Sequence, residues 1–261
     1  MYRDTVTSAQ NPRIKHLLAL QEKSRVRREE GLFVVEGVRE VERAVANGFE
    51  IETLFLCLEI CTRQQKWLPE CNIVEVPAAL YAKIAYRGGT EGMIAELRCR
   101  DRRLEDLELG EAPLVMVLES VEKPGNLGAV LRTADAAGAD ALIVCDPLSD
   151  LYNPNVIRAS TGAVFSVPAV CCGSGEAIDF LKKKKIRILT AQLQDSDLYY
   201  DFDMRGPLAI VVGTESEGLS PVWRMAADAH IRIPMAGVCD SLNAGISAAV
   251  LLYEAVRQRR G

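Results

Sequence analysis

The chain has 261 residues, of which 49% are hydrophobic and 26% charged, with a net charge of −5 and an isoelectric point near 5.3. Its acidity argues against a protein that coats nucleic acid without sequence preference. The opening residues lack the apolar segment of a signal peptide, and no apolar run approaches the roughly eighteen residues that a membrane span needs. We therefore expect a globular, cytoplasmic protein that does not act at a membrane.

The placement of cysteine and histidine argues against a structural metal site. The eight cysteines include no Cys-x-x-Cys pair, and the only histidines, His16 and His230, lie far apart in the sequence. Chains without a leader normally keep their thiols reduced. We expect reduced, mostly buried cysteines and no bound metal.

The first hundred residues predict a small α/β or α+β domain, because short apolar strands alternate with helical patterns. The predicted elements are a helix after Asn11-Pro12, a strand over 31–37, a helix over 38–47, strands over 53–58 and 72–76, and a final segment near 95–98. A stretch dense in charge follows, from Cys99 to Asp106. Its composition is typical of a linker between domains.

The N-terminal part is more basic than the rest of the chain. Residues 1–103 carry 17 Lys and Arg against 15 Asp and Glu, whereas the other 158 residues carry 14 against 21. Arg25, Arg27 and Arg28 form a cluster that fits either phosphate contact or a solvated helix face. Any polyanion should be bound first by this part of the chain.

Beyond the linker, near-continuous apolar strands alternate with helical stretches. This pattern indicates an α/β domain whose parallel sheet is buried on both faces. The predicted strands are 114–118, 141–145, 164–167, 186–190, 208–212 and 230–233.

Three loops that follow these strands are candidates for an active site, since open α/β sheets bind ligands at the carboxyl ends of their strands. The first reads EKPGNLG over residues 122–128 and leads into an Ala-rich helix. We expect Asn126 on the loop and Arg132 about a turn and a half into the helix. The second loop reads GTESEGL over 213–219, and the third reads AGVCDSLN over 236–243 before a long final helix.

Each loop alone is explained better by structural needs than by a site. Glycines permit tight turns, and Ser or Asn at the end of a loop often caps a helix. The phosphate-binding patterns GxxxxGK[ST] and GxGxxG are absent from the sequence. Their absence argues against the common types of nucleotide-binding site. The presence of all three loops in one chain favours a site.

As an ordered set, NLGAVLRTADAAGA, IVVGTESEGLS and IRIPMAGVCDSLNAGISAAVLLYE resemble the three motifs of the SpoU (TrmH) family of RNA 2'-O-ribose methyltransferases. The resemblance covers residues 114–257. More loosely, SAQNPRIK and FVVEG are similar to the RNA-binding domain that often precedes this catalytic domain. The implied organisation is an RNA-binding domain over 1–98, a linker over 99–112, and a methyltransferase domain over 113–261.

The resemblance implies an S-adenosylmethionine-dependent enzyme with a C-terminal trefoil knot, which works as a homodimer through the knotted domain. Threaded chains are otherwise rare, so periodicity alone does not predict the knot. Carried over by position, the catalytic residues would be Asn126, Arg132, Glu215, Ser241 and Asn243. The cofactor-binding residues would be Gly213, Thr214, Ile233, Met235 and Leu242, and we expect RNA contacts from Arg13, Lys15, Arg25, Arg27 and Arg28.

Methyl transfer to a ribose hydroxyl needs alignment of the 2'-oxygen with the methyl group and removal of its proton. We expect Asn126 to orient the ribose or its phosphate and Glu215 to fix Arg132. The arginine of this family is often assigned as the general base. Because a guanidinium stays protonated, we favour a role in which Arg132 stabilises the developing alkoxide and holds a phosphate that accepts the proton.

The two-part organisation favours ribosomal RNA over transfer RNA as the substrate, and we expect no DNA partner. Two alternatives remain at this point. One is a non-catalytic RNA-binding module for ribosome assembly on the same fold. The other is a nucleotide-binding enzyme unrelated to RNA, which the missing phosphate motifs disfavour.

Overall fold

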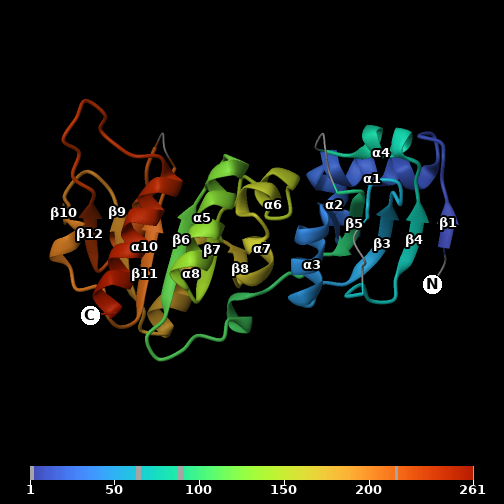
Figure 1. The fold of residues 1–261 in the computed structure, drawn as a ribbon. Helices are drawn as coiled ribbons and strands as arrows, with labels where there is room; N and C mark the ends of the chain where they lie inside the picture. The colour runs from blue at the N-terminus through green and yellow to red at the C-terminus, as the bar shows by residue number, and fades with distance from the viewer. Residues whose placement is uncertain (1–2, 63–65, 87–90, 215–216, 261) are drawn as a thin grey trace. The chain divides into compact units, whose positions relative to one another are not determined.

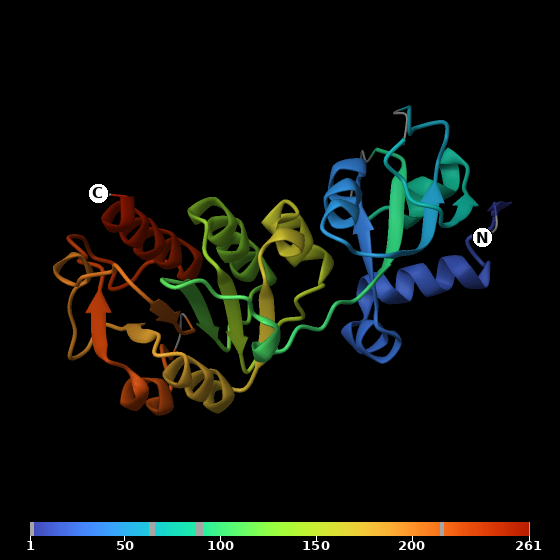
Figure 2. The same ribbon diagram turned by 90° about the horizontal axis from the view of Figure 1, so that it is seen from below.

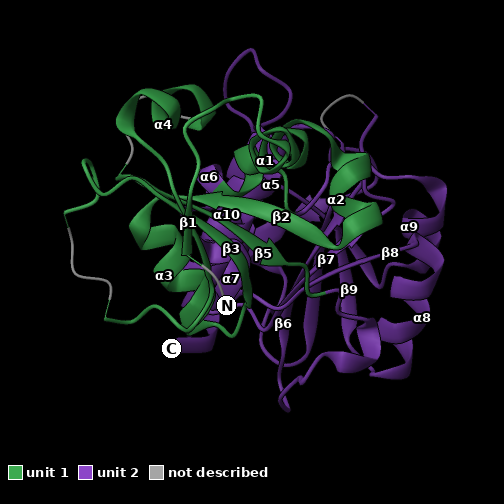
Figure 3. Cartoon of the chain, turned by 90° about the vertical axis from the view of Figure 1, so that its right-hand side faces the viewer, with its two compact units in different colours: residues 1–100, 152–157 green, residues 101–151, 158–261 purple. Residues whose placement is uncertain are grey.

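The computed structural model describes residues 3–62, 66–86, 91–214 and 217–260. The chain forms two compact units, shown in Figure 3: unit 1 holds residues 1–100 and 152–157, and unit 2 holds residues 101–151 and 158–261. The sequence patterns did not predict that residues 152–157, which follow the second strand of unit 2, belong to unit 1. Among the described residues no helix is long and apolar enough to cross a bilayer.

Unit 1 is built on a mixed five-stranded sheet with the order β1-β4-β3-β5-β2. β4 pairs parallel with β1 and β3, and β5 pairs antiparallel with β3 and β2. The strands are β1 (Arg3–Thr5), β2 (Leu32–Glu36), β3 (Ile51–Leu56), β4 (Asn72–Glu75) and β5 (Met93–Arg98), and the helices are α1 (Pro12–Glu22), α2 (Ser24–Glu30), α3 (Val38–Ala46) and α4 (Ala78–Ile84). The sequence predicted these elements to within about two residues except for β1, α2 and α4.

Helix α1 shows how the sequence sets the local structure of unit 1. The Asn11 side chain accepts a hydrogen bond from the Arg13 amide at 2.9 Å, and Pro12 occupies the first helical position, where its missing N–H is not needed. Ile14, Leu17 and Leu20 recur at helical spacing and are fully buried in the core of the unit. The helix is therefore held by its apolar side, which leaves its polar side to solvent.

Unit 2 contains a seven-stranded sheet with the order β10-β12-β9-β11-β6-β7-β8, and every strand pair in it is parallel. All residues of β6, β7 and β11 are buried, as the apolar runs predicted. The strands are β6 (Leu114–Glu119), β7 (Ala141–Cys145), β8 (Ala169–Cys172), β9 (Arg187–Ala191), β10 (Asp197–Leu198), β11 (Leu208–Val212) and β12 (Ala229–Arg232).

Helices cover both faces of this sheet, as Figures 1 and 2 show. α5 and α10 pack against each other on one face, and α8 and α9 lie on the other. The remaining chain forms the helices α5 (Pro124–Ala137), α6 (Pro154–Ser160), α7 (Ala163–Ser166), α8 (Ser174–Lys183), α9 (Pro221–Ala226) and α10 (Ala244–Arg260), with short 3-10 turns η1 (Leu104–Asp106) and η2 (Tyr199–Asp201). The α/β class predicted for this part is confirmed.

Two local predictions were wrong. Residues 164–167, predicted as a strand, lie largely in the short helix α7, and the strand is β8 just beyond Pro168. A short buried apolar run fits either state, so its periodicity cannot decide between them. Asn126, predicted on a loop, lies in the first turn of α5, because Pro124 already begins that helix.

Candidate functional site

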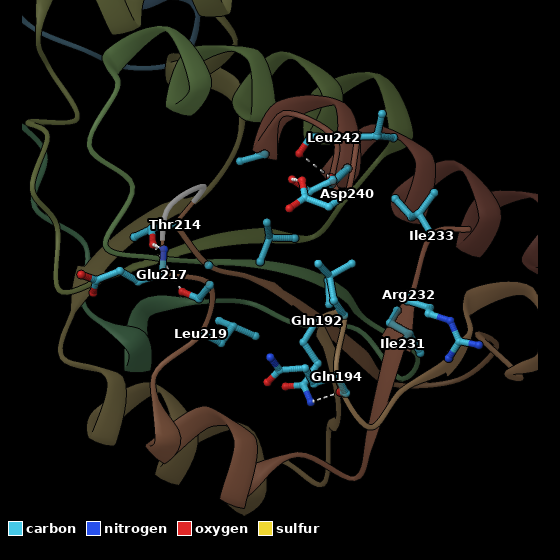
Figure 4. Close-up of a pocket in the computed structure, with 18 of the residues that line it drawn as sticks. Gln192, Gln194, Thr214, Glu217, Leu219, Ile231, Arg232, Ile233, Asp240 and Leu242 are labelled. Atoms are coloured by element: carbon cyan, nitrogen blue, oxygen red, sulfur yellow. Dashed lines mark hydrogen bonds between the residues drawn. The ribbon is translucent and has the colours of Figure 1, made fainter. Parts of the chain in front are cut away.

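A cavity of about 320 Å³ lies at the carboxyl edge of the parallel sheet of unit 2 (Figure 4). Four separate stretches of chain line it. They are 191–194 after β9, 212–214 with 217–219 after β11, 231–233 with Met235 after β12, and 240–242 with Ala244 and Ser247 at the start of α10; Arg224 of α9 completes the lining. Because β11, β9 and β12 are neighbours in the sheet, distant parts of the sequence meet at this edge.

A second cavity of about 120 Å³ adjoins the first. Val121, Glu122, Lys123 and Asn126, which follow β6, line one side of it. Gly213, Thr214 and Ala244 line both cavities. The two cavities therefore share a wall, and the loop after β6 faces the loop after β11.

The shared wall depends on Gly213. A Cβ atom at this position would lie 2.2 Å from the carbonyl oxygen of Gly218, a distance that no side chain tolerates. The amides of Thr214 and Gly218 each donate to the other residue's carbonyl at 3.1 Å, and the Glu217 amide donates to Oγ1 of Thr214 at 3.0 Å. The loop folds back on itself, so its backbone lines the cavity.

Asn243 joins the start of α10 to the start of α5. Its Oδ1 accepts a hydrogen bond from the Gly245 amide at 2.9 Å, which caps α10. Its Nδ2 donates to Oδ1 of Asn126 at 3.1 Å. The two helices pack closely here, since a Cβ on Gly245 would lie 3.3 Å from Cβ of Ala129. A single amide thus serves both as a helix cap and as a partner of Asn126.

The other predicted catalytic residues form no hydrogen bond with the Asn126–Asn243 pair within the described part of the chain. Arg132 is exposed on α5, and no hydrogen bond or ion pair joins it to another residue of the described ranges. It lies six positions after Asn126, so at about 100° per residue the two side chains leave α5 on different sides. Ser241 lines the first cavity, and its hydroxyl donates to Oδ1 of Asp240 at 3.2 Å. Glu215 lies outside the described residues.

The residues predicted to bind a cofactor are brought together. Gly213, Thr214, Ile233, Met235 and Leu242 all line the first cavity, although up to 29 positions of sequence separate them. Apolar side chains and loop backbone make up much of this lining. No group of three described His, Cys, Asp or Glu side chains is placed to hold a metal ion.

Sequence reasoning missed Glu119, the last residue of β6, which is only 5% exposed. One carboxylate oxygen accepts from the Ser220 amide at 2.8 Å, and the other accepts from the Ser220 hydroxyl and lies 3.4 Å from the Ser174 hydroxyl, which donates to Oδ2 of Asp146 at 2.5 Å. The Ser174 hydroxyl also accepts a hydrogen bond from the indole nitrogen of Trp223 at 3.0 Å. Through these hydrogen bonds, Glu119 at the end of β6 holds Ser220, the residue that follows the 213–219 loop. A charged residue ending an otherwise apolar strand was the signal for it.

Gln192, just after β9, was also missed. The residue lines the first cavity, and its side-chain oxygen Oε1 is buried and, within the described part of the chain, accepts no hydrogen bond. No motif surrounds this residue in the sequence, so only the position of β9 beside β11 brings it to the site.

Four of the five side chains predicted to contact RNA lie at the surface of unit 1. Lys15 and Arg28 are exposed, Arg25 pairs with Glu29, and Nη1 of Arg13 lies 2.9 Å from Oδ2 of Asp4. Arg27 is the exception. It is 2% exposed and donates to the carbonyls of Leu20 and Gln21 at 2.6 and 3.1 Å, so it closes the turn between α1 and α2 and is not accessible to a phosphate.

Comparisons with known proteins place this chain in a family. The model of the SpoU rRNA methylase family matches residues 113–253, and that of the MRM3-like substrate-binding domain matches residues 11–95. The 23S rRNA (uridine(2479)-2'-O)-methyltransferase of Streptomyces viridochromogenes is 33% identical over 97% of this chain and 92% of its own length. A 23S rRNA (guanosine(2553)-2'-O)-methyltransferase of Bacillus subtilis is 27% identical over 95% of this chain and 97% of its own length.

Solved structures share the fold along the whole chain. The AdoMet-bound rRNA methyltransferase of Sinorhizobium meliloti superimposes with a TM-score of 0.90, at 30% identity, over 98% of both chains. A structure described as an RNA 2'-O ribose methyltransferase gives a TM-score of 0.86 at 41% identity, over 98% of this chain and all of that one.

Proposed function

The chain belongs to the SpoU rRNA methylase family, and from this premise we propose that it methylates the ribose 2'-hydroxyl of a nucleotide in ribosomal RNA with S-adenosylmethionine as the methyl donor. Relatives that match along nearly the whole chain are 23S rRNA 2'-O-methyltransferases, and one neighbouring structure contains AdoMet. The observation in this molecule that carries the proposal is the pair of adjoining cavities with shared lining residues, which can hold a cofactor and a substrate side by side.

The first cavity fits the cofactor. Gly213 leaves a cradle of backbone that any Cβ would fill, and Ile233, Met235 and Leu242 supply apolar surface for a flat ring. Loop backbone can accept and donate hydrogen bonds to a nucleoside without a dedicated motif. When bound, S-adenosylmethionine supplies an electrophilic methyl group and needs no metal to do so.

The second cavity fits the acceptor ribose. Asn126 lines it, and its amide is oriented by the hydrogen bond from Asn243. Lys123 lines it as well and brings a positive charge toward the place where a phosphate of the RNA backbone would lie. In this arrangement Asn126 holds the ribose or its phosphate next to Gly213 and Thr214, the residues that also line the cofactor cavity.

Arg132 and Glu215 complete the proposed machinery. A guanidinium remains protonated at neutral pH, so we assign Arg132, on its place in the motif and not on its position beside Asn126, to stabilising charge on the 2'-oxygen and to holding a phosphate that takes the proton. Its exposure and its freedom from bonds to other described residues leave the guanidinium open to RNA. We assign Glu215 to orienting Arg132 and Ser241 to the cofactor side.

Unit 1 supplies RNA binding in this proposal. Arg13, Lys15, Arg25 and Arg28 lie at its surface on and next to α1 and α2. Charged contacts to phosphates position an RNA without reading its sequence, whereas target choice depends on RNA shape and on splayed bases. Replacing these four residues with Gln should weaken RNA binding and flatten its dependence on salt.

We also propose a homodimer through unit 2, with the chain knotted between β11 and α10. Ile246 and Tyr253 lie seven residues apart on α10, so they share a face, and they are 53% and 51% exposed. A second copy would cover these apolar side chains. Ile246→Glu combined with Tyr253→Glu should give a monomer in analytical ultracentrifugation, whereas the parent sediments as a dimer.

The decisive experiment is a map of ribose methylation on ribosomal and transfer RNA from cells with and without the gene. A single 2'-O-methyl mark on ribosomal RNA should disappear in the deletion, return with the parent protein and stay absent with Arg132→Ala. A lost mark on transfer RNA alone would refute the ribosomal substrate. An unchanged map, together with a purified protein that binds no S-adenosylmethionine in calorimetry, would favour the non-catalytic RNA-binding alternative.

A further inference from the structure

Gln192 offers a hydrogen-bond acceptor that the protein itself does not use. Gln192 lines the first cavity, the Oε1 atom of its side chain is buried, and among the residues that the structure describes this atom has no donor. A buried acceptor without a partner is unfavourable, so native structures normally keep one only where a ligand or another unseen group supplies the donor. This residue therefore points to a ligand group that donates.

The orientation of the Gln192 amide is fixed by its surroundings. Nε2 donates to the backbone carbonyl of Gln194 at 2.8 Å, and the Gln192 backbone amide donates to the carbonyl of Ile231 at 3.0 Å. Turning the side-chain amide over would place Oε1 against the Gln194 carbonyl, so that two acceptors would meet. Oε1 consequently remains the atom that is left for a ligand (Figure 4).

The strand order tells which end of the cofactor Gln192 meets. Asn126 follows β6, Gly213 follows β11 and Gln192 follows β9, and these three strands are consecutive in the sheet. At about 4.8 Å between neighbouring strands, Gln192 lies roughly 10 Å from the edge where Asn126 faces the acceptor ribose. The methyl group has to lie near Asn126, so Gln192 meets a part of the cofactor remote from the sulfonium.

The residues beside Gln192 indicate which hydrogen-bond donor of the cofactor fits there. Leu219 and Ile231, which are 3% and 0% exposed, line the same cavity, and in Figure 4 they are drawn on either side of Gln192. A neutral amide between apolar side chains suits the amino group on the edge of an aromatic base. The cationic ammonium of the methionine part would instead favour Glu217 or Asp240, which also line the cavity.

We propose that Oε1 of Gln192 accepts a hydrogen bond from the exocyclic 6-amino group of the cofactor's adenine and makes the cavity selective for an adenosyl group. This assignment rests on the proposed function, since it presumes that S-adenosylmethionine occupies the first cavity. It goes further by naming the side chain that recognises the base.

The test measures binding by isothermal titration calorimetry, with no RNA and no turnover. The three probes are S-adenosylhomocysteine, its analogue with hydrogen in place of the 6-amino group, and 5'-methylthioadenosine, which lacks the amino-acid part. The parent should bind S-adenosylhomocysteine about tenfold more tightly than the 6-deamino analogue, the value of one buried hydrogen bond. In Gln192→Leu this ratio should fall to about one, and methylthioadenosine should weaken by the same factor as S-adenosylhomocysteine.

The control variant is Gln10→Leu, which changes an exposed glutamine of unit 1 and should leave all three affinities unchanged. Because the readout is a ratio between probes, partial misfolding of a variant does not alter it. An unchanged ratio in Gln192→Leu overturns the assignment, and so does weakening confined to S-adenosylhomocysteine, which would assign Gln192 to the amino-acid part. A parent protein that binds none of the probes would instead refute the proposed function, and this assignment with it.

Discussion

Nδ2 of Asn243 donates a hydrogen bond to Oδ1 of Asn126 at 3.1 Å and thereby links the first turns of α10 and α5. The same side chain caps α10 through Oδ1. A cap requires only an acceptor, whereas the link to Asn126 requires a donor. The two roles of Asn243 can therefore be separated by mutation.

Asn243→Asp should keep the cap and lose the link. The carboxylate still accepts from the Gly245 amide, but it repels Oδ1 of Asn126 and leaves that amide without its orientation. We expect the thermal unfolding midpoint to stay close to that of the parent and the rate of methyl transfer to fall about ten- to a hundredfold. Asn243→Ala should lower both quantities. Equal rates for Asn243→Asp and the parent would show that the link has no role in turnover.

Arg132→Lys tests whether the guanidinium acts as a planar donor. Lysine keeps the charge but loses the fork of N–H groups that holds a phosphate and an oxyanion together. We expect the rate of methyl transfer to fall about a hundredfold, by comparison with loss of one oxyanion donor, while the affinity for S-adenosylhomocysteine is unchanged. Arg103→Lys, at an exposed arginine outside both cavities, is the matched control. A parental rate and pH–rate profile for Arg132→Lys would contradict the assigned role.

Gly213→Ala tests the shared wall. The new Cβ would meet the Gly218 carbonyl at 2.2 Å, so the loop has to move, and we expect unfolding to become easier by about 1–3 kcal/mol. The affinity for S-adenosylhomocysteine should fall at the same time. Gly175→Ala is the control, because a Cβ there meets nothing within 4 Å and alanine favours the helix α8. A Gly213→Ala protein with parental stability and affinity would show that the loop is not needed in this conformation.

The stability of unit 1 should depend on pH through His16. Its Nδ1 lies 3.0 Å from Oε1 of Glu96, and its Nε2 lies 2.5 Å from Oε2 of Glu30. Burial lowers the pKa of His16, but the hydrogen bond to Glu30 and the charges of Glu96 and Glu30 outweigh it, so the pKa is raised above 6.5. Burial raises the pKa of Glu96, although the His16 contact opposes it.

A raised histidine pKa contributes stability that is complete below about pH 6.5 and is lost as the pH rises through the raised value. The raised pKa of Glu96 has the same sign, but its contribution begins to be lost above pH 4.5, so the change between pH 6 and 8 is assigned to His16. Amide hydrogen exchange of α1 and β5 should accordingly accelerate as the pH rises from 6 to 8, after correction for the intrinsic rate. His16→Asn should flatten this dependence. An equally steep dependence in that variant would assign it to other groups.

The sequence predicted the sheet of unit 2 well because buried parallel strands are apolar along their whole length. It failed at residues 164–167, where three apolar residues and a serine fit a helix turn as readily as a strand. In unit 1, β1 and α4 are too short and too weakly patterned to be recognised.

The sequence predicted only those residues of the candidate site that belong to a motif. Asn126, Gly213 and Asn243 belong to motifs, and the structure brings them to adjoining walls. Gln192 and Glu119 stand alone among ordinary residues, and their meaning depends on which strands are neighbours in the sheet. Arg27 was predicted to contact RNA because of its charge, but the turn between α1 and α2 buries its side chain.

Two hydrogen bonds that hold the site together join residues far apart along the chain. Glu119 and Ser220 are 101 positions apart, and Asn126 and Asn243 are 117 positions apart. Contacts of such long range form only after the intervening chain has been closed into a loop, which makes them slow. We therefore expect the ability to bind cofactor to emerge late in refolding, after most helical signal has returned. During synthesis, the enzyme would become competent only once α10 has left the ribosome.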